Sequence, residues 1–162
     1  MENLGRTCVA ALCVCLCTSA YAHAHAAGDL ERIQQIVDDL KTRLAIPQTV
    51  HVTLVPTNPT LFSVAPVEHE RGTFLLSVEE DFARALNDEE LTAAVAHELG
   101  HVWIYTHFPY LQTEELANDV ASRVIDRSTL RPLYEKVWNR TAAAELKAEV
   151  IHQQAGELRP LP

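Results

Sequence analysis

The feature that most constrains this chain is a pair of histidines four residues apart, His97 and His101, with Glu98 directly after the first. On an α-helix, residues four apart lie on the same face one turn from each other, so both imidazoles can bind one metal ion. Glu98 would lie beside that face, where its carboxylate can take a proton from a water molecule that the ion polarises, without being a ligand itself. This chemistry requires the stretch to be helical.

The residues before His97 have the features of a helix start. Asn87 or Asp88 can cap the first turn, and acidic residues follow the cap, as is favourable near a helix N-terminus. Apolar residues then recur at spacings of three and four: Leu91, Ala94, Val95, Leu99 and Val102. We therefore predict a capped and largely buried helix whose two histidines bind a metal ion, rather than a core helix that holds them by coincidence.

Residues 1–26 differ in kind from the rest of the chain. A short polar start containing Arg6 precedes an apolar run over residues 7–20, and small residues suited to cleavage follow before residue 27. This pattern predicts a signal peptide over residues 1–26, a single domain over residues 27–162, and a secreted or periplasmic protein with no stable membrane span after cleavage. An uncleaved anchor is the alternative.

Cysteine usage and charge narrow the possibilities further. The four cysteines all fall within the predicted signal peptide: Cys8, Cys13, Cys15 and Cys17. The mature protein would then have neither a disulfide nor a thiolate metal ligand, so zinc would have to be held by histidine and carboxylate. The net charge of −9 argues against nucleic acid and anionic membranes as partners. The sequence does not predict the oligomeric state.

The hydrophobic pattern predicts an α+β domain with a small sheet of about three strands packed on the active-site helix, together with further helices. In chain order, we expect a helix over 27–45, strands over 49–55, 61–67 and 73–78, and a short helix over 79–86, then the active-site helix, a helix over 114–127, and closing helices over 133–138 and 142–154. The strand over 73–78 is the last before the active-site helix. We expect it to be the edge strand beside the site, where an extended substrate could pair with it.

A catalytic zinc site needs three protein ligands and one open position, so a third ligand must follow His101. His107 stands six residues later, which is the spacing of the metzincin motif. That motif has a glycine at the position of Ile104, and a β-branched residue does not readily adopt the backbone of such a turn. His107 is therefore a weaker candidate.

Glu114 is the favoured third ligand because it opens a helix that can fold back across the active-site helix. Asn118 lies one turn further on the same face, where it could hydrogen-bond a ligand histidine. Glu115 and Asp119 remain rival carboxylates.

The motif His97-Glu98-Leu99-Gly100-His101, followed by Glu114-x-x-Ala117-Asn118-x-x-Ala121, resembles the gluzincin-type HExxH zinc metallopeptidases. It is similar both to the prenyl-protease-like family and to the small repressor-cleaving metallopeptidases, over roughly residues 73–125. The resemblance implies a zincin-like domain that binds Zn²⁺ through His97, His101 and Glu114. It also implies hydrolysis of peptide bonds in a peptide or protein substrate, with Glu98 as the general base on zinc-bound water.

Two other functions remain open on the sequence. One is a non-catalytic zincin-like module whose zinc serves recognition of a protein partner, and the other is a zinc hydrolase acting on a substrate other than a peptide. An intact Glu98 favours an enzyme, because a structural zinc site needs no general base. An enzyme would also need a group that stabilises the oxyanion. The candidates for that role are Tyr105, His107, Tyr110, Arg131 and Tyr134.

Overall fold

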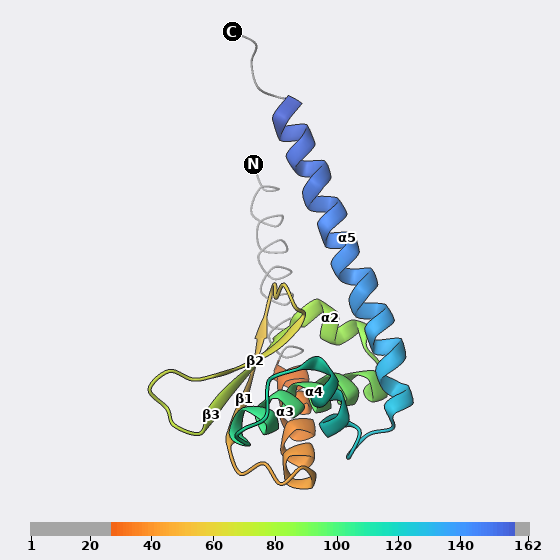
Figure 1. Ribbon diagram of the computed structural model, residues 1–162. Helices are drawn as coiled ribbons and strands as arrows, with labels where there is room; N and C mark the ends of the chain where they lie inside the picture. Colours follow the sequence, from red (N-terminus) through yellow and green to blue (C-terminus); the bar gives the residue numbers. More distant parts are fainter. Residues whose placement is uncertain (1–26, 158–162) are drawn as a thin grey trace, which may run out of the picture.

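The computed structural model describes residues 27–157, so the predicted signal peptide lies outside the described residues. A helix over residues 27–43 leads into the elements that Figure 1 labels. These are β1 (Thr49–Val55), β2 (Phe62–Pro66), β3 (Thr73–Glu79), α2 (Glu80–Ala85), α3 (Asp88–Thr106), α4 (Glu114–Ala121), the 3₁₀ turn η1 (Arg127–Thr129) and α5 (Leu130–Glu157). The α+β prediction is confirmed. Among the helices that the structure describes, none combines the length and apolar character needed to cross a membrane.

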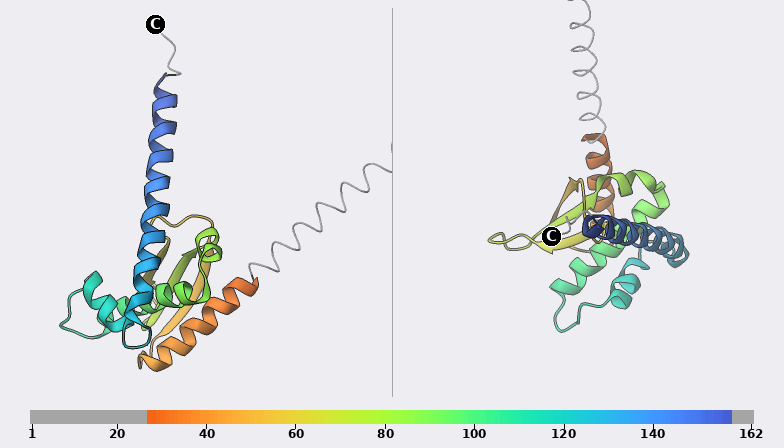
Figure 2. Two further views of the ribbon diagram at one scale, coloured as in Figure 1. Left: turned by 90° about the vertical axis from the view of Figure 1, so that its right-hand side faces the viewer. Right: turned by 90° about the horizontal axis from the view of Figure 1, so that it is seen from above.

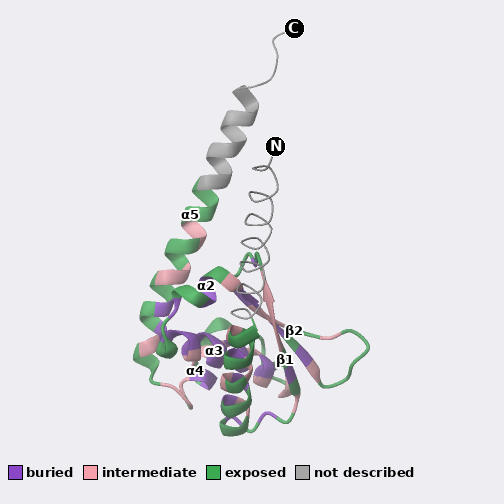
Figure 3. Ribbon diagram, turned by 180° about the vertical axis from the view of Figure 1, so that it is seen from behind, coloured by how far each residue is buried: buried purple, intermediate pink, exposed green. Residues whose placement is uncertain are grey.

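The sheet has the strand order β1–β3–β2, with β1 parallel and β2 antiparallel to β3. Helices cover one of its faces (Figures 2 and 3). Alternate residues of the strands point into a single core, as their period of two requires. That core joins side chains of the first helix, the sheet and α3, including Ile33, Val37, Leu40, Val50, Phe74, Leu76, Val78, Leu91, Val95 and Leu99. The other face is open, and His51 and Leu75 are exposed on it.

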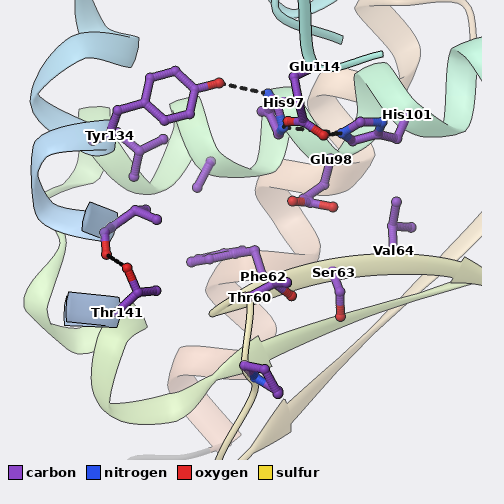
Figure 4. Close-up of a pocket in the computed structure, with 14 residues that line it drawn as sticks. Thr60, Phe62, Ser63, Val64, His97, Glu98, His101, Glu114, Tyr134 and Thr141 are labelled. Carbon is purple, nitrogen blue, oxygen red and sulfur yellow. Dashed lines mark hydrogen bonds and ion pairs between the residues drawn. The ribbon is translucent and has the colours of Figure 1, made fainter. Parts of the chain in front are cut away.

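The strand order overturns one prediction. β3 is the central strand of the sheet, paired on both sides, so it cannot be the edge strand beside the site. That position belongs to β2, whose free edge faces α3 (Figure 4). The chain reaches this order because β2 and β3 form a hairpin through Gly72, while β1 pairs with the far side of β3.

Two predicted helix boundaries are also wrong. The predicted helix over 114–127 ends at Ala121, where the Ser122 hydroxyl bonds the Asn118 carbonyl and tighter turns follow. The two predicted closing helices form the single helix α5, since no helix breaker lies between them. Pro132 falls in the first turn of α5, where a missing N–H costs little.

Three contacts fix where α3 begins. Asn87 caps the helix by accepting a hydrogen bond from the Glu90 N–H at 2.9 Å, and the Glu90 carboxylate accepts from the Asn87 N–H at 2.9 Å. This reciprocal capping box satisfies two N–H groups that the helix leaves free. Lys136 of α5 donates to the same buried carboxylate at 2.6 Å, so α5 is fastened to the start of α3. The hydrogen bond from Lys136 lowers the pKa of Glu90 below its ordinary value.

This ion pair predicts how stability depends on pH. A carboxylate with a lowered pKa contributes stability above the pKa of the unfolded chain and loses it as the pH falls through the folded pKa. We expect Lys136→Met to reduce the unfolding free energy by about 1–2 kcal/mol at pH 7. The buried Glu90 carboxylate loses its partner, but the Lys136 side chain is 42% exposed, which reduces the effect. The deficit should shrink towards zero as Glu90 becomes protonated in acid.

Denaturant titrations from pH 7 to pH 3 measure this difference. Arg131→Met is the matched control, since it removes the exposed Arg131–Glu135 pair from the same helix and should cost at most about 0.5 kcal/mol. An equal, pH-independent deficit in both variants would contradict the assignment.

Candidate metal centre and cleft

The close crossing of α3 and α4 is what brings the candidate ligands together. Gly100 lies at the crossing, directly against Ala117 of α4. A Cβ atom added to Gly100 would lie 2.5 Å from the Ala117 carbonyl oxygen and 2.9 Å from its Cα atom. Both are backbone atoms, so they could move aside only if α4 itself moved. The absence of a side chain at Gly100 therefore sets how near Glu114 and Asn118 lie to the two histidines.

We expect Gly100→Ala to displace α4 and to cost about 1–3 kcal/mol of unfolding free energy, the usual effect of overpacking a close contact. Zinc affinity should fall with it, because α4 carries one of the three candidate ligands, Glu114. Gly28→Ala is the matched control, as a Cβ there would meet nothing within 4 Å. Thermal denaturation and zinc titration of both variants test this. A Gly100→Ala protein with the stability and zinc affinity of the wild type would contradict it.

Two imidazole nitrogens and a carboxylate converge on one point above α3 (Figure 4). The Nε2 atoms of His97 and His101 are 3.2 Å apart. The Glu114 carboxylate places Oε2 3.1 Å from His97 Nε2 and Oε1 3.5 Å from His101 Nε2. Ligand atoms bound tetrahedrally at about 2.0–2.1 Å lie about 3.3–3.4 Å from one another, so these spacings fit a single zinc-sized ion. The residues present therefore suit the metal that the sequence predicts.

The hydrogen-bond partner of Nδ1 fixes the tautomer of each imidazole. His97 Nδ1 lies 2.8 Å from Asn118 Oδ1, and His101 Nδ1 lies 3.1 Å from Gln112 Oε1. Both partners are acceptors, so each Nδ1 carries the proton and each Nε2 presents a lone pair. Burial lowers the pKa of His97, which keeps the ring neutral. Two lone pairs and a carboxylate facing one another repel, and a cation between them removes that repulsion.

Glu98 points away from this cluster, into the space between α3 and β2 (Figure 4). It is only 9% exposed. Burial raises the pKa of Glu98 to about 7, against the opposing effects of His101 and of the Val64 N–H. A bound cation would lower this pKa again. A carboxylate that titrates in this range can both accept and return a proton near neutral pH.

The site opens into a cleft of about 560 Å³ between β2 and α5. Its inner wall is apolar, with side chains from β2, α3 and α5: Phe62, Ala94, Leu133 and Val137. Thr141 adds to this apolar character because its hydroxyl bonds the carbonyls of Val137 and Trp138 within α5, at 3.0 and 3.1 Å. The cleft thus has a polar edge, formed by His97, His101 and Glu114, and an apolar interior.

β2 offers backbone groups to this cleft. Val67 donates its N–H to Thr73, and Leu61 accepts from Glu79, so the odd-numbered residues of this stretch turn their polar groups towards β3. In an antiparallel pair the alternate residues turn theirs outward. Val64 is such a residue, and it lines the cleft beside Glu98. The free edge of β2 therefore presents the N–H and C=O groups of Val64 next to the site.

The rival ligand candidates lie elsewhere. His107 stacks on Trp103 with ring centroids 3.9 Å apart, and its Nδ1 bonds the Trp103 carbonyl at 2.7 Å. Asp119 pairs with Arg127 at 3.0 Å, and Glu115 is exposed outside the residues that line the cleft. Among the oxyanion candidates, Tyr134 lines the cleft. His97, His101 and Glu114 form the metal-compatible cluster within the described part of the chain.

Sequence reasoning missed two features of the site. Gln112 precedes α4 and reaches back to His101, where it also donates to the backbone carbonyl at 3.0 Å. Its position in the loop gave no periodic signal. The apolar wall from α5 was missed as well, because Leu133 and Val137 fit any core-facing helix. Asn118, by contrast, bonds His97, one of the candidate ligands, from the position that the sequence predicts.

Comparisons with known proteins add little to this geometry. No protein-family model matches the sequence, and no curated protein matches it. One similar solved structure is that of the metallopeptidase zymogen abylysin from Pyrococcus abyssi, at 17% identity and a TM-score of 0.48, over 67% of this chain and 93% of that one. A likeness at this level assigns neither a family nor an activity to this chain.

Proposed function

We propose that this protein is a zinc-dependent metallopeptidase that hydrolyses peptide bonds in peptide or protein substrates. The observation that carries the proposal is the cluster of His97, His101 and Glu114 beside a separate buried carboxylate, Glu98, within one cleft. A zinc site that served only recognition or stability would need the three ligands but not the fourth group. Glu98 is not one of the three converging groups, and it faces the space between α3 and β2 where a substrate would lie.

The roles of the residues follow from their positions. His97, His101 and Glu114 would hold the ion, which when bound supplies Lewis-acid chemistry by polarising a carbonyl and lowering the pKa of water. Glu98 would accept the proton of the attacking water and pass it to the leaving amine. Asn118 and Gln112 would keep the two imidazoles oriented with Nε2 towards the ion.

The shape of the cleft supports an extended peptide as the substrate. The outward C=O group of Val64 can pair with a peptide backbone laid along β2, as in strand addition to a sheet edge, while its N–H faces Glu98. The same placement would direct one substrate side chain towards Phe62 and Val137, in the apolar interior. We therefore propose that cleavage sites carry a large apolar residue beside the scissile bond.

Digestion of a peptide library tests the proposal. The protein is stripped of metal with a chelator, then assayed with and without one equivalent of zinc, and the products are identified by mass spectrometry. We expect cleavage only with zinc, at sites enriched in large apolar residues. A blank digest by a protein that binds zinc stoichiometrically would contradict a peptidase and support the non-catalytic zinc-binding module instead.

We also propose that the protein is exported, so that it acts as a secreted or periplasmic enzyme. The support is the apolar, cysteine-containing segment within residues 1–26, which has the composition of a signal peptide. Sequencing the N-terminus of the protein recovered from its native compartment tests this. A start at residue 27, or at residue 23 or 25, is expected, and a start at Met1 would contradict cleavage.

A further inference from the structure

Tyr134 reaches the metal centre from α5 without facing the point where the ligands converge. Its hydroxyl donates to Asn118 Oδ1 at 2.6 Å and lies 3.3 Å from His97 Nδ1. Its ring meets the His97 ring edge to face, with centroids 6.1 Å apart. Nδ1 is the nitrogen opposite the ligand atom, so Tyr134 contacts His97 from behind (Figure 4).

Asn118 Oδ1 therefore accepts two hydrogen bonds, one from His97 Nδ1–H and one from the Tyr134 hydroxyl. These occupy both lone pairs of the amide oxygen. Which end of the amide faces His97 matters, because the NH₂ end would require an unprotonated Nδ1 and would place the ring proton on Nε2. A ring in that tautomer cannot bind a metal ion through Nε2. A second donor on the oxygen holds the amide in the productive orientation.

α5 presents Tyr134 from a fixed position. Lys136 pairs with the buried carboxylate of Glu90 at 2.6 Å, and Arg140 pairs with that of Glu79 at 2.9 Å. The two basic residues are one turn apart on α5 and bind the start of α3 and the end of β3. Tyr134 thus enters the site from a helix that is docked on both the sheet and the active-site helix.

We propose that Tyr134 is a positioning residue for the metal centre: through Asn118, its hydroxyl holds His97 with Nε2 free to bind the ion. The inference depends on the proposed zinc site and adds a residue from a third helix to it. It assigns Tyr134 a role distinct from contact with the substrate. Removing the hydroxyl should therefore weaken metal binding even when no substrate is present.

A double-mutant cycle on zinc affinity tests this role. The zinc dissociation constant is measured by competition with a chromophoric chelator for the wild type, Tyr134→Phe, Asn118→Ala and the double variant. Outer partners of metal ligands typically change affinity 10–100-fold, so we expect about a tenfold loss for Tyr134→Phe and a larger loss for Asn118→Ala. The double variant should bind no more weakly than Asn118→Ala alone, because Tyr134 acts through Asn118.

The controls separate positioning from general stability. Tyr110→Phe alters a tyrosine that packs on Trp103 outside the cleft, and it should leave the affinity unchanged. The melting temperature of the metal-free Tyr134→Phe protein should match that of the wild type. Two results would overturn the role of Tyr134 and leave the proposed function standing. One is equal zinc affinity in Tyr134→Phe and the wild type. The other is that Tyr134→Phe lowers the zinc affinity of the Asn118→Ala protein as much as that of the wild type. A wild type that binds no zinc would overturn both.

Discussion

Glu98→Gln is expected to bind one zinc ion per chain, as the wild type does, and to hydrolyse peptides about 10²–10⁴-fold more slowly. The amide has nearly the same shape as the carboxylate but cannot take up the proton of the attacking water. Because Glu98 points away from the three candidate ligands, its loss should leave the metal site intact. Metal analysis together with peptide hydrolysis rates measures the two effects separately.

Glu89→Gln is the matched control for this substitution. Glu89 is an exposed residue in the first turn of the same helix, outside the residues that line the cleft, so its loss should change neither zinc content nor rate. Glu98→Gln with wild-type activity would rule out its role as general base. Loss of zinc in Glu98→Gln would instead mean that this carboxylate is a ligand.

Glu114→Ala should have the largest effect on metal binding. It removes the carboxylate that lies 3.1 Å from His97 Nε2 and 3.5 Å from His101 Nε2, and leaves two ligands where a catalytic zinc site needs three. We expect zinc affinity to fall by more than the roughly 100-fold that marks the upper range for outer partners. Peptide hydrolysis should fall with it at limiting zinc.

Glu115→Ala is the matched control for Glu114→Ala, because Glu115 is the next residue on the same helix turn and is also exposed. It should bind zinc as the wild type does, and so should Asp119→Ala and His107→Ala. Chelator competition on the purified variants gives the affinities. If Glu115→Ala or Asp119→Ala lost zinc while Glu114→Ala kept it, the third ligand would have been assigned to the wrong carboxylate.

The parts of this site that the sequence predicts are those set by local periodicity. His97 and His101 share a face because their spacing matches one helical turn, and Asn87 caps the helix through contacts within three residues. Glu114 and Asn118 share a face of α4 for the same reason. Such relations do not depend on how distant segments pack, so residue spacing alone is enough to infer them.

The parts that could not be predicted depend on contacts between segments far apart in the chain. β3 is the central strand because it pairs with β2 on one side and with β1 on the other, which leaves β2 at the edge. The composition of the strands does not determine this pairing. Tyr134 meets His97 across 37 residues and Gln112 meets His101 from a loop, so neither has a repeating pattern. Gly100 is a further case. A side chain there would collide with Ala117 of α4, and that contact cannot be inferred until the packing of α4 on α3 is known.

The most direct test of the central claim is anomalous diffraction at the zinc absorption edge from crystals of the zinc-loaded protein. We predict one strong peak, about 2.0–2.2 Å from Nε2 of His97, from Nε2 of His101 and from a carboxylate oxygen of Glu114, with Glu98 outside bonding distance. A peak elsewhere on the molecule, or one bonded to Glu98 in place of Glu114, would contradict the account.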